Sequence, residues 1–159
     1  MTPEPEDVGY ESVGSQENLE RFLVEYGLTA DDVQGKVAVR ATVGVGGAPG
    51  PDKYLVHESL LRSHGEFPCA GDAAALEFCR QIAAEMVTAF DISLDEAVAR
   101  INRDWSTPNA GGRTPRVWMI GQDIAYHETA AYWARTIYYG KESMWWLPGA
   151  APVPRPPPR

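Results

Sequence analysis

A change of hydrophobic period along the chain constrains its fold more than any other sequence feature. Residues 15–26 carry apolar side chains at helical spacing, whereas residues 36–43 alternate between apolar and other side chains, which is typical of a half-buried strand. Residues 53–61 predict a second strand, and residues 72–90 return to helical spacing. Helical and strand segments in one short chain predict the α+β class.

Signals for helix ends add further elements. Ser93 and Glu96 have the spacing of a capping box, which predicts a helix that begins after Ser93. The short apolar run 116–121 predicts a strand, and Asp123 is the expected N-cap of a last helix that ends at Gly140. The predicted order of elements is therefore α-β-β-α-α-β-α.

This order predicts a small antiparallel sheet of about three strands, with three to four helices packed on one face. The length suits a single α+β domain over residues 15–149. Residues 1–14 are acidic and are expected to be disordered, and the Pro-rich residues 150–159 are expected to form a disordered or polyproline tail. The helix over 72–90 should bury one stripe of side chains: Leu76, Cys79, Ala83, Met86 and Phe90.

The charge of the chain narrows the classes of partner. It has 22 acidic and 14 basic side chains and a net charge of −8. Nucleic acids and anionic membrane surfaces need a cationic footprint, so neither is the expected partner. An acidic chain suits a basic protein partner. The charge does not decide whether the chain forms a homo-oligomer.

The sequence also favours the cytoplasm. The first residues lack the features of a signal peptide, and no apolar run approaches the length of a membrane helix, about 20 residues. Cys69 and Cys79 form no CxxC motif and are interpreted as two free thiols in a reducing compartment. Cys69 is the better candidate nucleophile. It lies near His64 and just before a predicted helix, whose N-terminus lowers the pKa of a thiol, whereas Cys79 lies on the core stripe.

No motif for cofactor or metal chemistry is complete. The glycine-rich loop 44–52 lacks the P-loop pattern and precedes no helix N-terminus, so a flexible hairpin connection is favoured. His127 and Glu128 begin a zinc-protease pattern, but Ala131 stands where its second histidine is needed. We therefore expect no cofactor and no metal.

The stretch from Tyr126 to Trp146 holds seven of the sixteen aromatic residues. At helical spacing it divides into two rows. The first row is expected to join the core: Tyr126, Ala130, Trp133 and Ile137. The second is an amphipathic row that helix formation alone does not require: Glu128, Tyr132, Arg135 and Tyr139. Trp145 and Trp146 are adjacent, so one can be buried while the other stays exposed.

The leading hypothesis is a non-enzymatic protein-binding module. Its predicted binding residues are Glu128, Tyr132, Arg135, Tyr139 and Trp146, with His127 beside them. Aromatic and arginine side chains carry much of the energy of protein interfaces. The alternative is a small-molecule binder or enzyme with a pocket between the sheet and the aromatic helix, where His57, His127, Glu128 and Arg135 converge. A third hypothesis is a structural or regulatory subunit that is active only within an oligomer.

In its small size, acidity and tryptophan content the chain resembles bacterial toxin-neutralising immunity proteins. The resemblance is one of general character and rests on no motif. It implies an inhibitor that binds another protein.

Overall fold

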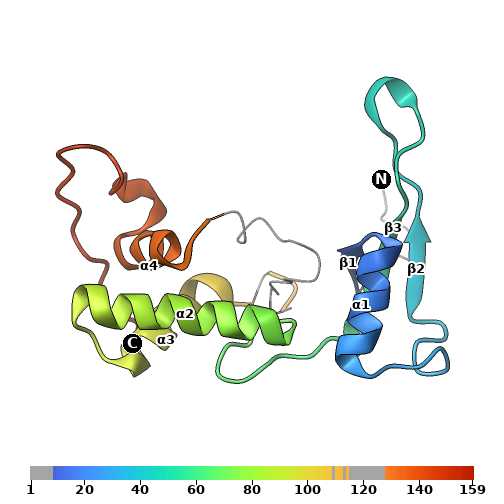
Figure 1. Ribbon diagram of the computed structural model, residues 1–159, viewed down its shortest axis with the longest axis horizontal. Coiled ribbons are helices and arrows are strands. Elements are labelled where there is room, and N and C mark those ends of the chain that lie inside the picture. The colour runs from blue at the N-terminus through green and yellow to red at the C-terminus, as the bar shows by residue number, and fades with distance from the viewer. Residues whose placement is uncertain (1–8, 109, 113, 115–127) are drawn as a thin grey trace. The chain divides into compact units, whose positions relative to one another are not determined.

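The computed structural model of the chain confirms the α+β class, with a three-stranded antiparallel sheet and four helices (Figure 1). The structure describes residues 9–108, 110–112, 114 and 128–159. It divides into two compact units, residues 1–62 and 63–159, which are described one after the other. The single domain over residues 15–149 stays a prediction.

The sheet lies in the first unit and has the strand order β1-β3-β2. Its strands are β1 (Tyr10–Gly14), β2 (Val37–Arg40) and β3 (Lys53–His57). The two strands predicted from alternation are confirmed in shorter form as β2 and β3, and they pair antiparallel across a long connection. This connection contains a short 3-10 turn, η2 (Val45–Gly47), and another, η3 (Glu58–Leu60), follows β3.

The third strand is β1, so the prediction of a disordered segment over residues 1–14 is wrong for residues 10–14. β1 pairs with the central strand β3, and Val13 is buried. Tyr10 holds the start of the strand, because its ring packs edge-on against His57 and its hydroxyl donates to the Gly35 carbonyl at 3.3 Å. The strand predicted at 116–121 lies outside the described residues.

Helix α1 (Gln16–Tyr26) begins and ends where the sequence predicts. The Ser15 side chain accepts a hydrogen bond from the Asn18 amide, and Gly27 ends the helix in the left-handed conformation. The helix packs against β1 and β3 with Phe22 and Tyr26 buried. This packing gives the sheet a hydrophobic cover that an isolated three-stranded sheet would lack.

The second unit contains α2 (Ala73–Phe90), α3 (Leu94–Trp105) and α4 (Ala130–Tyr139) (Figure 1). Ser93 is the N-cap of α3, as predicted, and α2 begins after its own N-cap, Asp72, at which the predicted helix starts. Only half of the predicted capping box forms, because the carboxylate of Glu96 binds Arg100 at 2.9 Å. No helix in the described part of the chain is long and apolar enough to cross a membrane.

The core of the second unit is built on α2, which contacts both other helices. The predicted stripe is confirmed at Cys79, Ala83 and Met86, which are fully buried, whereas Leu76 and Phe90 are only partly buried. Helix α4 adds two buried side chains, Ala134 and Ile137. It begins after Thr129, whose side chain accepts a hydrogen bond from the Tyr132 amide, so the helix starts later than predicted. The predicted N-cap, Asp123, lies outside the described residues.

Residues 150–159 form no helix or strand, but Arg155 and Pro156 contact α3 and α4, which differs from a disordered tail and leaves the polyproline alternative as a prediction. The Arg155 amide donates to the Tyr138 carbonyl at 2.9 Å, and its guanidinium binds the Asp104 carboxylate on α3. Arg103 donates to the Pro156 carbonyl at 2.7 Å. We call Arg155 and Pro156, with these contacts, the tail clasp. It ties the chain end to α3 and α4.

Deletion of residues 151–159 is expected to lower the free energy of unfolding by about 1–2 kcal/mol. Two hydrogen bonds of about 1 kcal/mol each and a partly exposed ion pair are lost. Urea denaturation followed by circular dichroism measures the change. Deletion of residues 157–159 alone is the matched control, because it keeps the tail clasp. Equal stability of the full-length and 151–159-deleted proteins would contradict docking of the tail.

Candidate functional site

The predicted binding residues do not form one flat exposed row. Glu128 is exposed immediately before the α4 N-cap, whereas Tyr132, Arg135 and Tyr139 are each half-buried. Trp146 is 49% exposed. His127 lies outside the described residues.

The half-buried members pack within the second unit. The ring of Tyr132 contacts the rings of Trp133 and Trp145, with centroid distances of 5.3 and 5.5 Å. Tyr139 packs edge-on against Phe90 of α2 at 5.4 Å. Through these contacts Tyr132 and Tyr139 pack α4 against α2 and against the segment that follows α4. This differs from the predicted outward-facing surface.

The exposed apolar surface lies after α4. Met144, Trp146 and Leu147 are 53%, 49% and 47% exposed, and we call these three side chains the C-terminal patch. Trp145 anchors the segment, because its indole Nε1 donates to the Thr136 hydroxyl at 3.1 Å. Met144 and Leu147 are not among the binding residues predicted from the sequence. Their only signal is an apolar run, residues 144–147, that precedes Pro148 and Gly149.

Met144 has a left-handed backbone conformation, with φ of 53°. This conformation is strained for a residue other than glycine, and it persists only where surrounding contacts impose it. Such contacts flank it, because Ser143 donates through its hydroxyl to the Gly140 carbonyl at 2.7 Å and Leu147 donates to the Met144 carbonyl at 3.0 Å. The turn that carries the patch therefore has a defined backbone conformation.

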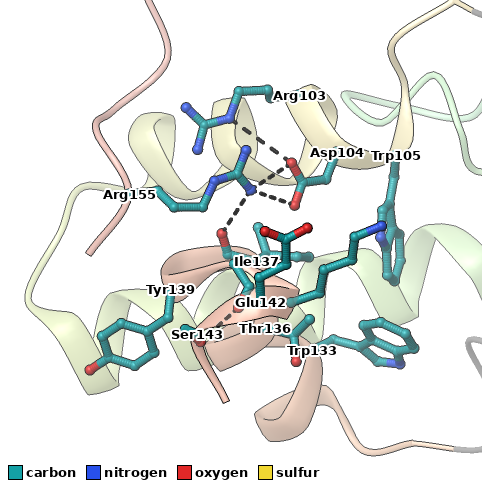
Figure 2. A pocket seen from close by; sticks show the side chains of 12 residues that line it. Arg103, Asp104, Trp105, Trp133, Thr136, Ile137, Tyr139, Glu142, Ser143 and Arg155 are labelled. Atoms are coloured by element: carbon teal, nitrogen blue, oxygen red, sulfur yellow. Dashed lines mark hydrogen bonds and ion pairs between the residues drawn. The ribbon is translucent and has the colours of Figure 1, made fainter. Parts of the chain in front are cut away.

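A separate cleft of about 650 Å³ lies in the second unit (Figure 2). It is bounded by the end of α3, by α4 from Trp133 onward, by the short helix η5 (Lys141–Ser143) and by Arg155. Its aromatic lining consists of Trp105, Trp133 and Tyr139. Gly140 allows Arg155 to approach closely, because a Cβ atom at this position of positive φ would lie 3.2 Å from the Arg155 Cδ.

Two arginines compete for one carboxylate in this cleft. Nη1 of Arg155 lies 2.8 Å from both oxygens of Asp104, whereas Nε of Arg103 lies 4.0 Å from the nearer one (Figure 2). Nε and Nη2 of Arg103 are buried and have no hydrogen-bond partner among the described residues. Burial, and next the charge of Arg155, lower the pKa of Arg103.

The polar groups predicted for the alternative pocket do not line this cleft where the structure describes them, at His57, Glu128 and Arg135. His57 lies in the first unit, where its Nδ1 is 2.7 Å from the Ser59 hydroxyl. Glu128 and Arg135 are absent from the lining, and Arg135 instead donates to the Ala131 carbonyl at 3.0 Å. Among the predicted binding residues that the structure describes, Tyr139 alone lines the cleft.

The two thiols lie together in the core. The sulfurs of Cys69 and Cys79 are 4.0 Å apart, and both side chains are fully buried. The hydrogen bond between them lowers the pKa of Cys69 to about 7 and raises that of Cys79. Cys69 is thus the more acidic thiol, as predicted, but its burial leaves no surface for a substrate. The described residues contain no group of three or more potential metal ligands.

Comparisons of the chain with protein-family models, with curated proteins and with solved structures found no match.

Proposed function

We propose that the chain is a protein-binding module that contacts its partner through the C-terminal patch. The observation that carries the proposal is the exposure of three large apolar side chains, Met144, Trp146 and Leu147, on a turn held by Trp145. Exposed apolar side chains that cluster and are held in a defined shape are typical of protein interaction sites. Tyr132 supports the segment that carries the patch by packing against Trp145.

The proposed partner is a protein with an apolar depression that receives Trp146. Residues 1–62 carry eleven acidic and five basic side chains, whereas residues 63–159 carry eleven acidic and nine basic ones. The preference for a basic partner therefore comes mainly from the first unit, which would steer a basic protein toward the chain. The patch itself would select for shape and apolar surface. The expected compartment of the protein remains the cytoplasm.

The test combines Trp146→Ser with Leu147→Ser. Both side chains are about half exposed, so we expect the free energy of unfolding to change by no more than about 0.5 kcal/mol for each substitution. Partner affinity is expected to fall by about thirtyfold or more, as for the loss of an interface hot spot. A photo-reactive side chain at position 144 identifies the partner, and calorimetry with the purified partner measures the affinity.

Leu94→Ser is the matched control, because Leu94 is 59% exposed on α3 and does not belong to the patch. The control should bind like the unchanged protein. Equal affinity of the double variant and the control would overturn the proposal, and so would a photo-reactive side chain at position 144 that forms no cross-link.

A further inference from the structure

We propose that the cleft between α3, α4 and η5 binds a small aromatic carboxylate, with the carboxylate received by Arg103 and Arg155. This site is distinct from the C-terminal patch and does not depend on the proposed protein-binding function. Four observations support it: an excess of cations, a guanidinium edge without acceptors, an aromatic wall, and a volume that suits a small ligand.

The excess of positive charge in the cleft favours an anionic ligand. Three cationic side chains line the cleft, Arg103, Arg155 and Lys141, against two carboxylates, Asp104 and Glu142. Both oxygens of Asp104 are already engaged by Arg155. Arg103 therefore lacks a full counter-charge at hydrogen-bond distance, although it is partly removed from water. A charge that is partly removed from water and has no close partner is destabilised, and an incoming anion would offset that cost.

The geometry of Arg103 favours a carboxylate. Nη1 is engaged by the Pro156 carbonyl, which leaves Nε and Nη2 without acceptors among the described residues. These two groups form one planar edge of the guanidinium, and this edge matches the two oxygens of a carboxylate. One negative charge also balances the excess of one positive charge. A phosphate monoester carries nearly two negative charges and would face Asp104 and Glu142.

The walls of the cleft favour an aromatic body on the ligand. Trp105 and Trp133 meet edge-to-face, with ring centroids 5.4 Å apart, and both line the cleft together with Tyr139. Flat apolar rings gain packing and quadrupole interactions against such a wall. A volume of about 650 Å³ lies within the range of small-molecule sites, about 300–1,000 Å³.

Access requires one side chain to move. Nε and Nη2 of Arg103 are buried in the present conformation, and the neighbouring side chain of Arg155, which also lines the cleft, is 33% exposed. The Arg155 backbone is held at Tyr138, so its side chain can rotate while the tail stays docked. The entering carboxylate would then lie between the two guanidinium groups, which otherwise repel each other.

The test is a titration of the full chain with benzoate and with benzamide, which has the same shape and no charge. Chemical shifts of the Gly140 and Arg155 amides and of the Trp105 and Trp133 indoles report binding. We expect saturable binding of benzoate with a dissociation constant of about a millimolar or less, as for a ligand of about nine heavy atoms. Benzamide, acetate and phenyl phosphate should each bind at least tenfold more weakly.

Arg103→Gln should weaken benzoate binding at least tenfold. Arg80→Gln is the matched control, because Arg80 pairs with Glu66 in the same unit and does not line the cleft. If Arg103→Gln fails to fold, Lys141→Gln replaces it, with an expected loss of at least threefold from an exposed lysine.

Equal binding of benzoate and benzamide would overturn the proposal, as would the absence of saturation at tens of millimolar. Tighter binding of phenyl phosphate than of benzoate would overturn the assignment to carboxylates. A similar loss of benzoate affinity in Arg80→Gln and Arg103→Gln would show that binding depends only on the overall charge of the protein. That result would also overturn the proposed site.

Discussion

Met86→Ala is expected to lower the free energy of unfolding by about 2–5 kcal/mol, the range for a large apolar side chain removed from a packed core. Met86 has no exposed surface and lies on the face of α2 that forms the core of the second unit. Truncation to alanine removes its packing contacts and leaves a cavity that the three helices can fill only in part. Urea denaturation followed by circular dichroism at 222 nm measures the loss.

Glu85→Ala is the control for this variant. Glu85 is the preceding residue on the same helix and is exposed, so its substitution should change stability by no more than about 0.5 kcal/mol. Similar stabilities for the two variants would show that the assigned core face of α2 is wrong.

Replacement of Tyr132, Arg135 and Tyr139 together by serine is expected to cost about 2–4 kcal/mol of stability. Two half-buried rings are lost, and each packs against another aromatic side chain, Tyr132 against Trp145 and Tyr139 against Phe90. If the three residues formed an outward-facing interface, as the helical row indicated, the same change would leave the fold nearly unaffected. A chemical melt of the purified variant separates these results.

A second triple variant serves as the control: Tyr132→Phe, Arg135→Lys and Tyr139→Phe. It keeps both rings and the positive charge, so its stability should remain close to that of the unchanged protein. Wild-type stability in the serine variant would contradict the packing described for these rings. It would also make Tyr132, Arg135 and Tyr139 candidates for an exposed binding surface again.

Local signals made most helix boundaries predictable. Ser15, Asp72 and Ser93 each lie immediately before a helix and accept a hydrogen bond from its first turn, which is a relation between residues three positions apart. The alternation that identified β2 and β3 is also local. The stripe that includes Met86 follows from helical spacing alone, because a long apolar face on a helix has to be buried.

Contacts between distant residues were not predictable in the same way. Strand β1 is held by pairing with β3, and composition alone made its residues look like a mobile acidic segment. The cleft depends on Arg155 reaching Asp104, and nothing in the spacing of a Pro-rich tail indicates that contact. The start of α4 was placed too early because Asp123 and Thr129 both have side chains that suit an N-cap, and the helix begins after Thr129.

The tail clasp has a consequence for the order in which the helices assemble. Helices α2 and α3 are joined by residues 91–93, whereas the contact between Asp104 and Arg155 joins residues 51 positions apart. Closing the longer loop costs more chain entropy and takes longer. We infer that α2 and α3 pair first and that α4 docks afterwards together with the clasp. In the folded protein, the backbone amides of α4 and Arg155 would then exchange with solvent as one group, ahead of those in α2.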